Sequence, residues 1–246
     1  MKDKVVKKDK NFIHVMKLEG VSKTYKQKNR SIKVLLDVNI DFNSNSFYAI
    51  MGHSGSGKST LINILGLIDT FDSGTYELYG TTTTNFNDKE SSNLRMKNIG
   101  FVFQGFHLNP NLNAFENVIV PMLINKEIDP KDRKKLAIEL LESVGLGERI
   151  DHFPNELSGG EQQRVAIARA LANNPHVILA DEPSGNLDEK AEADIFKQLK
   201  ELSQKGKCVI VVSHSNEVRK YANKVLKIVD GKIVGDDKWV SKIILT

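Results

Sequence analysis

One stretch of the sequence decides the fold: Gly52-His53-Ser54-Gly55-Ser56-Gly57-Lys58-Ser59. Its spacing matches the pattern G-x-x-x-x-G-K-[ST], in which glycines let the backbone wrap closely around phosphate and point N–H groups at the anionic oxygens. In this pattern Lys58 reaches the β- and γ-phosphates of a nucleotide, and the Ser59 hydroxyl ligates Mg²⁺. The stretch therefore predicts a nucleoside triphosphate site, with a glycine-rich turn that binds no ligand as the alternative.

The residues on either side of this loop favour the nucleotide site. Residues 47–51 are continuously apolar, which is typical of a buried strand that feeds a turn. After the loop, Leu61, Ile64 and Leu65 recur at helical spacing. The N-terminus of such a helix adds a positive end to a phosphate site. We therefore expect a strand, the phosphate loop and a helix in succession.

A pair of acidic residues follows another apolar strand. Residues 177–180 are uniformly apolar, and Asp181 and Glu182 come directly after them. Ligands in open α/β sheets bind outside the carboxyl ends of the strands. At such a position Asp181 can hold Mg²⁺ through water, and Glu182 can polarise the attacking water as a general base. A solvated acidic turn is the alternative, but the phosphate loop favours the catalytic interpretation.

A third motif, at residues 157–162, reads Leu-Ser-Gly-Gly-Glu-Gln and opens a predicted helix that runs through Ala170. Ser158 is suited to a helix N-cap, and the glycines leave the first N–H groups accessible to an anion. A plain capped helix is the alternative. One nucleotide needs only one phosphate loop, so the ligand of this second helix start does not follow from the residues alone.

Composition and charge favour a globular protein without a membrane span or an internal disulfide. The chain has 246 residues, of which 40% are hydrophobic and 27% charged, a globular composition. Its net charge of +4 is too small to indicate nucleic-acid binding by itself. The single cysteine, Cys208, excludes an internal disulfide. No apolar run approaches the roughly 18–20 residues that span a bilayer, and residues 1–10 lack the apolar stretch of a signal peptide, so we expect a cytoplasmic protein.

The pattern along the chain predicts an α/β protein. Residues 36–42 alternate between apolar and polar, which favours a half-buried antiparallel strand. The predicted strands at 177–180 and 208–213, the second apolar up to Val212, flank a helical stretch at 191–203, as expected of a parallel sheet covered on both faces. We therefore expect a P-loop NTPase core with a mostly parallel sheet, an N-terminal antiparallel β subdomain and an inserted α-helical subdomain.

The insertion is predicted from the middle third of the chain. Asp129 and Pro130 resemble an N-cap and a first-turn proline, and apolar residues follow at helical spacing up to Val144, before Gly145. The expected division is a flexible tail, a nucleotide-binding core in two parts, the helical insertion and a C-terminal tail: residues 1–11, 12–104 with 158–235, 105–157, and 236–246.

Taken together, these motifs resemble the nucleotide-binding subunit of ABC transporters, and the resemblance covers about residues 12–235. The motif at 157–162 matches that family's signature nearly letter for letter. The resemblance implies an ATPase that binds ATP and Mg²⁺ and acts as a head-to-tail homodimer, or as a heterodimer with a similar ATPase. Each ATP would lie between the phosphate loop of one subunit, including Thr60, and four signature residues of the other: Ser158, Gly159, Gly160 and Glu161.

The resemblance also implies roles for single residues elsewhere. Tyr25 resembles the aromatic residue that stacks on adenine, with a core tyrosine as the alternative. Gln104 resembles the glutamine that contacts Mg²⁺ and the attacking water, and His214 resembles the histidine placed against the γ-phosphate. Residues 184–188 resemble the loop that crosses the dimer interface. The implied catalytic residues are Glu182, His214 and Gln104, and the implied Mg²⁺ ligands are Ser59, Gln104 and Asp181.

Three positions depart from the commoner family pattern. Ser215 stands where aspartate is frequent, and Asn109 and Asn113 replace hydrophobic and threonine residues. None of them removes a catalytic group, so the implied ATP hydrolysis is unaffected. The segment from Asn109 to Asn113 lies near the place where this family docks its membrane partner, so the departures bear on the partner.

Within the family, the chain most resembles one group, which contains the ATPases of macrolide exporters, lipoprotein-releasing systems and antimicrobial-peptide or bacteriocin exporters. This resemblance lies in residues 64–69, 116–118 and 185–188. This group implies a subunit held on the inner face of the cell membrane by an integral membrane permease, for export or extraction of a peptide, lipoprotein or drug. An ATP-driven switch of a cell-division or cell-wall system, without transport, is the alternative. A nucleic-acid or ribosome factor is not expected, because such proteins carry two cassettes per chain or long coiled coils.

Overall fold

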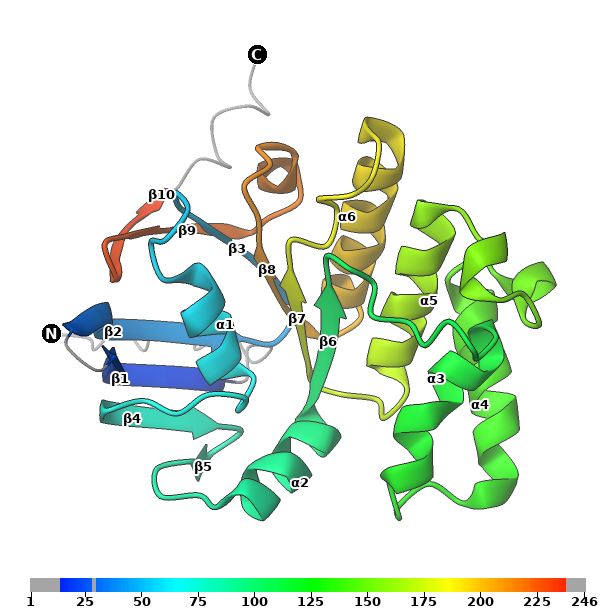
Figure 1. Cartoon of the computed structure of the whole chain (residues 1–246), viewed down its shortest axis with the longest axis horizontal. Helices are drawn as coiled ribbons and strands as arrows, with labels where there is room; N and C mark the ends of the chain where they lie inside the picture. The colour runs from blue at the N-terminus through cyan, green and yellow to red at the C-terminus, as the bar shows by residue number, and fades with distance from the viewer. Residues whose placement is uncertain (1–13, 28–29, 238–246) are drawn as a thin grey trace, which may run out of the picture.

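The computed structural model describes residues 14–27 and 30–237. The expected tail at residues 1–11 lies outside this part, as do residues 238–246 of the expected C-terminal tail. The described chain forms two sheets and a set of helices that pack against them (Figure 1). Within the described ranges, every helix is too short or too polar to span a bilayer.

The larger sheet has six strands in the order β10-β9-β3-β8-β7-β6. All neighbours pair in parallel except β9 and β10, which are antiparallel. This arrangement confirms the expected mostly parallel sheet. The bounds are β3 (Ser46–Met51), β6 (Ile99–Phe103), β7 (Val177–Asp181), β8 (Cys208–Val212), β9 (Lys224–Val229) and β10 (Lys232–Asp237).

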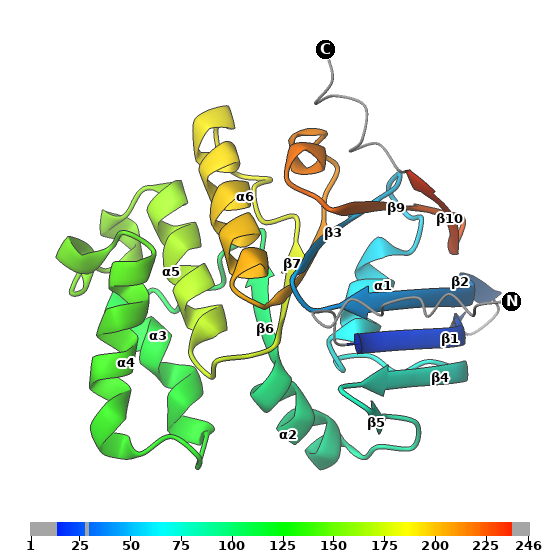
Figure 2. The ribbon, with the colours of Figure 1, turned by 180° about the vertical axis from the view of Figure 1, so that it is seen from behind.

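This sheet divides the hydrophobic interior into two cores. Alternate side chains of β3 enter different cores: Phe47 and Ala49 face one, and Tyr48 and Ile50 face the other. The first core lies under α5 (Gly159–Leu171) and α6 (Glu189–Gln204), and the second under α1 (Lys58–Leu65) (Figures 1 and 2). A strand covered on both faces has no solvent-facing side, which explains the uninterrupted apolar runs in the sequence.

A second, antiparallel sheet of four strands in the order β2-β1-β4-β5 packs beside α1. Its strands are β1 (His14–Gln27), β2 (Arg30–Asn43), β4 (Ser73–Leu78) and β5 (Thr81–Thr82). The strand expected at residues 36–42 lies within β2, where Val38, Ile40 and Phe42 are buried and the residues between them are exposed. The fully buried Tyr76 ties this sheet to α1, because its hydroxyl donates a hydrogen bond to the Leu65 carbonyl at 2.6 Å.

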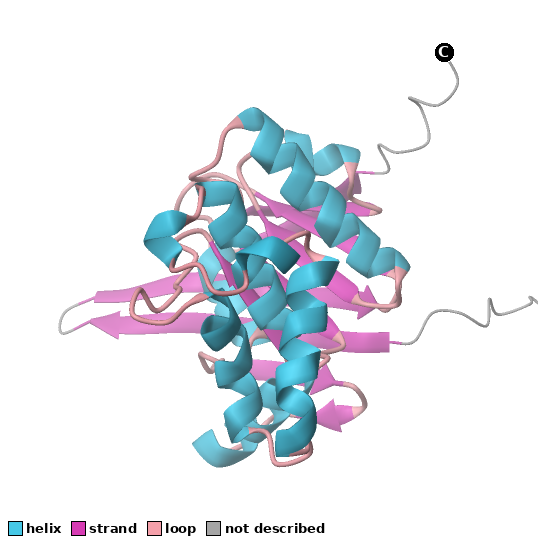
Figure 3. Cartoon of the chain, turned by 90° about the vertical axis from the view of Figure 1, so that its right-hand side faces the viewer, coloured by secondary structure: helices cyan, strands magenta, loops and turns pink. Residues whose placement is uncertain are grey.

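The remaining helices are α2 (Asp88–Asn98), α3 (Ala114–Ile124) and α4 (Pro130–Ser143), with short 3-10 turns at Gly147–Arg149, Pro154–Glu156 and Glu217–Lys220 (Figure 3). The expected cap of α4 is confirmed, since the Asp129 side chain accepts a hydrogen bond from the Lys131 N–H at 2.9 Å. Asn113 caps α3 in a reciprocal box with Glu116. The departure at Asn113 therefore keeps a good helix cap.

The link between Tyr76 and α1 leads to a stability prediction. Tyr76→Phe should lower the free energy of unfolding by about 1–3 kcal/mol, because the Leu65 carbonyl loses its buried donor. Tyr79→Phe is the matched control, since that ring is partly exposed and should change stability by less than about 0.5 kcal/mol. Urea unfolding measures both variants. Equal midpoints for the two variants would contradict the proposed importance of the Tyr76 hydroxyl.

Candidate functional site

An open cavity of about 920 Å³ lies where the carboxyl ends of β7 and β8 meet the start of α1. Its wall contains ten of the residues singled out in the sequence: Ser54, Gly55, Gly57, Lys58, Ser59, Thr60, Gln104, Asp181, Glu182 and His214. The structure therefore brings the phosphate loop, the acidic pair, the glutamine and the histidine together. The other eight candidates are not part of this wall: Tyr25, Gly52, His53, Ser56, Ser158, Gly159, Gly160 and Glu161.

The phosphate loop is shaped by close approaches between backbone segments. A Cβ on Gly52 would lie 2.3 Å from the Ile228 carbonyl oxygen, so no other residue fits there without a shift. Gly57 has φ of 105°, a left-handed conformation that glycine adopts without strain, immediately before α1 begins at Lys58. These two glycines hold the loop against β9 and β2, at the N-terminus of the helix.

The side chain of Lys58 lies inside the phosphate loop and bonds to its backbone. Its ammonium donates hydrogen bonds to the carbonyl oxygens of Gly52 and His53, each at 2.9 Å. Burial lowers the pKa of Lys58, and the nearby carboxylates of Glu182 and Asp181 oppose this shift. The ammonium therefore lies between the loop carbonyls and the acidic end of β7, where an anionic ligand would be attracted to it.

The acidic pair has an unusual backbone. Glu182 follows β7 with φ of 47°, and its N–H donates to the Val212 carbonyl at 2.9 Å. Its carboxylate accepts a hydrogen bond from the His214 N–H at 3.1 Å, and the His214 ring Nε2 lies 3.3 Å from the other oxygen. Left-handed backbone in a non-glycine residue is costly and often marks functional sites. Burial, followed by the charge of Glu182, raises the pKa of Asp181, while Lys58 opposes it.

The three expected metal ligands line the same cavity and provide a hydroxyl, an amide oxygen and a carboxylate: Ser59, Gln104 and Asp181. Such hard oxygen donors fit Mg²⁺, which is held by one or two carboxylates together with substrate phosphates and water. The described residues contain no group of three His, Cys, Asp or Glu that could form a metal cage on its own. The donor set therefore fits an ion that enters together with a phosphate ligand.

Gln104 is held by Asn186, a contact that was not predicted. The Gln104 amide donates to the Asn186 side-chain oxygen at 3.4 Å, and the Asn186 amide donates to the Gln104 carbonyl at 3.1 Å. Both residues line the cavity. Asn186 lies in the segment 184–188 that the sequence singled out, but nothing in the sequence paired it with Gln104.

The loop that follows Gln104 is also anchored from α5. Phe106 and His107 have φ of 57° and 49°, two successive left-handed residues. The partly buried guanidinium of Arg169 donates to the Phe106 carbonyl at 2.7 Å and to the His107 carbonyl. Burial lowers the pKa of Arg169. The sequence analysis predicted a helix through Ala170 and assigned no role to Arg169, so this contact was missed.

The helix that begins after Ser158 is capped by reciprocal hydrogen bonds between Ser158 and Glu161. The Ser158 hydroxyl accepts the Glu161 N–H at 3.3 Å and donates to the Glu161 carboxylate at 2.7 Å, and that carboxylate accepts the Ser158 N–H at 2.8 Å. The expected cap is thus confirmed. These hydrogen bonds from Ser158, with the charge of Arg149 also contributing, lower the pKa of Glu161.

Tyr25, expected to stack on adenine, is not among the residues of the described cavity wall. Its hydroxyl donates a hydrogen bond to Asp69, in the turn after α1. Val34, which was not predicted, lines the cavity from β2. Nothing in the sequence indicates that Val34 lines a cavity, because an apolar residue in a strand is more often part of the core.

Comparison with known proteins matches these features to a family. The family described as ABC transporter matches residues 35–185. The uncharacterised ABC transporter ATP-binding protein MJ1508 of Methanocaldococcus jannaschii is 47% identical over 220 residues, which cover 89% of this chain and 98% of that relative. The macrolide export ATP-binding/permease protein MacB of Chlorobaculum tepidum is 44% identical over 91% of this chain, but the match spans only 34% of MacB.

A solved structure is similar over nearly the same range. The ATP-binding cassette MJ0796, described as a dimer in a post-hydrolysis state bound to ADP and phosphate, superposes with a TM-score of 0.82 at 42% identity. The match covers 90% of this chain and 97% of that one. At this identity, the likeness extends beyond the fold to a shared type of nucleotide cassette.

The anchor at Arg169 leads to a prediction about the loop. Arg169→Lys keeps the charge but not the planar fork that reaches two carbonyls, so hydrogen exchange of the backbone at residues 104–108 should accelerate about fivefold. Arg164→Lys is the control on the same helix and should leave exchange of that loop unchanged. Mass-spectrometric exchange measures both. Unchanged exchange in the Arg169 variant would show that the loop holds its shape without the guanidinium.

Proposed function

We propose that this chain, which belongs to the ABC transporter family and is an ATP-hydrolysing cassette, drives a separate integral membrane permease through ATP-dependent dimerisation. One observation carries the proposal. The cavity gathers the phosphate loop, the acidic pair, Gln104 and His214, but its described wall does not include the helix start at Ser158. The chain then presents half of an ATP site, and a second subunit supplies the other half.

In a dimer, the helix that begins after Ser158 would have a ligand, namely the nucleotide bound to the other subunit. Its position at the beginning of α5 offers N–H groups and the positive end of a helix to an anion. In a head-to-tail homodimer, Ser158, Gly159, Gly160 and Glu161 would face the γ-phosphate bound to the partner's phosphate loop. The solved MJ0796 cassette, which is described as dimeric, supports this arrangement. ATP would join the two subunits, and its hydrolysis would release them.

The chemistry is assigned to residues of the cavity. The phosphate loop and Lys58 would bind the β- and γ-phosphates, and Ser59, Gln104 and Asp181 would hold Mg²⁺. When bound, this ion supplies charge neutralisation at the phosphate oxygens. Glu182 would orient the attacking water and accept its proton, and a new bond from that oxygen to the γ-phosphorus would replace the bond to ADP. His214, already hydrogen-bonded to Glu182, would position that carboxylate and contact the γ-phosphate.

The membrane partner and the direction of transport are proposed from the relatives. MacB is named as an ATP-binding/permease protein and a macrolide exporter, and this chain matches about a third of its length. We therefore assign this chain the ATP-binding part, on the inner face of the membrane, with a permease on a separate chain. The proposed task is export or extraction of a peptide, lipoprotein or drug. Purification of the chain with its membrane partner, followed by an efflux assay in cells that lack the chain, tests this assignment.

The role of Glu182 is tested by a conservative change. Glu182→Gln should bind MgATP yet hydrolyse it at least ~100-fold more slowly, because the amide cannot accept the proton of the attacking water. The variant should also accumulate ATP-bound dimers on size-exclusion chromatography, whereas the wild-type chain should return to monomers as ATP is consumed. Turnover near the wild-type rate would remove Glu182 from the proposed mechanism.

The contribution of the second subunit is tested at Ser158. Ser158→Arg should block ATP-driven dimerisation of the Glu182→Gln chain, because the bulky cation occupies the place of the γ-phosphate contact. Nucleotide affinity of the monomer should stay unchanged, since Ser158 is outside the described cavity wall.

Two controls accompany this variant. Loss of the helix cap costs about 1 kcal/mol, which urea unfolding can confirm. Ser143→Arg places the same side chain at an exposed position of α4 and should leave dimerisation intact. Loss of ATP binding by a folded Ser158→Arg monomer would contradict the head-to-tail arrangement.

A further inference from the structure

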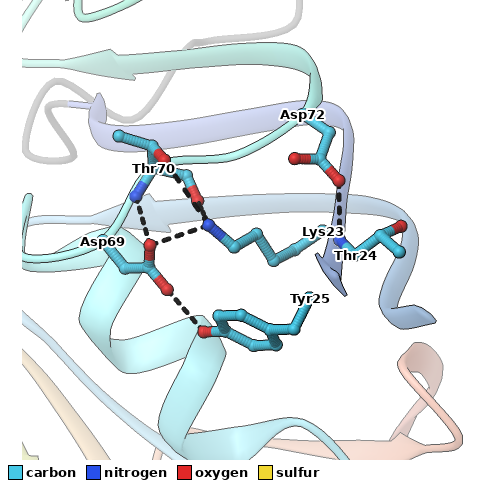
Figure 4. A network of polar contacts seen from close by, with 6 residues as sticks. All are labelled: Lys23, Thr24, Tyr25, Asp69, Thr70 and Asp72. Atoms are coloured by element: carbon cyan, nitrogen blue, oxygen red, sulfur yellow. Dashed lines mark hydrogen bonds and ion pairs between the residues drawn. The ribbon is translucent and has the colours of Figure 1, made fainter. Parts of the chain in front are cut away.

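A polar network joins strand β1 to the turn after α1 (Figure 4). Lys23 and Tyr25 are two residues apart on β1. Both reach Asp69, in the segment that connects α1 to β4. Figure 4 shows the Tyr25 hydroxyl and the Lys23 ammonium converging on this one carboxylate.

The carboxylate of Asp69 is fixed on both oxygens. Oδ1 accepts hydrogen bonds from the Lys23 ammonium and from the Thr70 N–H, each at 2.7 Å, and Oδ2 accepts the Tyr25 hydroxyl. Lys23 is only 7% exposed and also donates to the Thr70 carbonyl at 2.6 Å. Burial opposes ionisation of Asp69, but the hydrogen bonds from Lys23 and Tyr25 lower its pKa overall. An ionised, immobile carboxylate therefore holds the far end of the tyrosine.

The faces of the Tyr25 ring are not equivalent. The Lys23 ammonium lies 5.0 Å from the ring centroid, in a cation–π contact that covers one face. The residue is nevertheless 38% exposed. Burial raises the pKa of the Tyr25 hydroxyl, which also interacts with Thr60, a residue of the cavity wall. The hydroxyl end of the ring is thus held next to Thr60 of the cavity wall, while Lys23 lies over one face and part of the residue is exposed.

We propose that Asp69, braced by Lys23, is a positioning residue that fixes the Tyr25 ring for stacking on the base of the bound nucleotide. The proposal rests on the proposed function, since it needs ATP in the cavity. Asp69 acts through the tyrosine hydroxyl and does not touch the nucleotide. Lys23 leaves the base a single face of the ring on which to stack.

The advantage of this arrangement is preorganisation. A free tyrosine at a strand edge samples several rotamers, and binding would have to immobilise it. Fixing one side chain in advance is worth about a two- to tenfold gain in affinity. The gain applies only to ligands that carry a base, because the phosphate contacts are made by the loop at residues 52–59.

The experiment therefore compares two ligands, MgATP and magnesium-bound inorganic triphosphate, by calorimetry on the full chain. Asp69→Asn and Tyr25→Phe should each weaken MgATP binding about two- to tenfold and leave triphosphate binding unchanged. Both changes act on the same hydrogen bond, because phenylalanine lacks the donor and the neutral amide of asparagine is a weaker acceptor than the carboxylate. The double variant should therefore bind MgATP no more weakly than the weaker of the two single variants. Saturated ATP turnover should stay at the wild-type value while KM rises.

Asp72→Asn is the matched control. Asp72 accepts a hydrogen bond from the Thr24 N–H at 2.6 Å in the same network but does not touch Tyr25. This variant should bind both ligands as the wild-type chain does. Tyr25→Phe leaves the ion pair of Lys23 and Asp69 intact, so it decides the question alone if Asp69→Asn does not fold.

Three results would overturn the proposal: unchanged MgATP affinity in a folded Tyr25→Phe chain, an equal loss for triphosphate, or additive losses in the double variant. A wild-type chain that binds neither ligand would instead contradict the proposed function. The two failures are therefore distinguishable in one set of titrations.

Discussion

The close packing of three backbone segments at the phosphate loop is the constraint on which the rest of the site depends. Gly52 lies against the Ile228 carbonyl of β9, and Gly57 turns in the left-handed region beside the Val34 carbonyl of β2. The Lys58 ammonium donates hydrogen bonds to two carbonyl oxygens of this loop. Because β3 pairs with β9 on one side and β8 on the other, this geometry also determines where the ends of β7 and β8 stand relative to the loop. Asp181 and His214 reach the cavity for that reason.

Several parts of the site are held in conformations that they would not adopt alone. Glu182 and the pair Phe106 and His107 have left-handed backbones, and each is stabilised by a distant partner. Such strain persists only where surrounding contacts determine the conformation. The partner of Glu182 is the end of β8, and the partner of the loop after Gln104 is α5. The helix that carries Ser158 is thus in direct contact with the loop beside Gln104. In the proposed head-to-tail dimer these two elements of one chain would belong to different ATP sites, so the contact would connect one site with the other.

The expected elements were confirmed where the sequence carried a clear period or cap, as in β2 and α4. Two helices carry no clear period, although each begins with a capping box. None of the residues of α2 is buried, so it has no apolar stripe. In α3, Val118 and Met122 are buried while Leu123 and Ile124 are exposed, so the helix is apolar on several sides and has Pro121 inside it. A period of 3.6 residues cannot be read from either pattern.

Local chemistry could be predicted from the amino-acid sequence: the phosphate loop, the acidic end of β7, the caps at Asp129 and Ser158, and the resemblance to one family. These features depend on residues a few positions apart, whose spacing dictates their geometry. The contacts between groups far apart in the sequence became visible in the folded chain alone. Asn186 and Gln104 are 82 residues apart, Arg169 and Phe106 are 63 apart, and Tyr25 and Asp69 are 44 apart. Such contacts follow from how strands and helices pack, and no local pattern encodes the register of that packing.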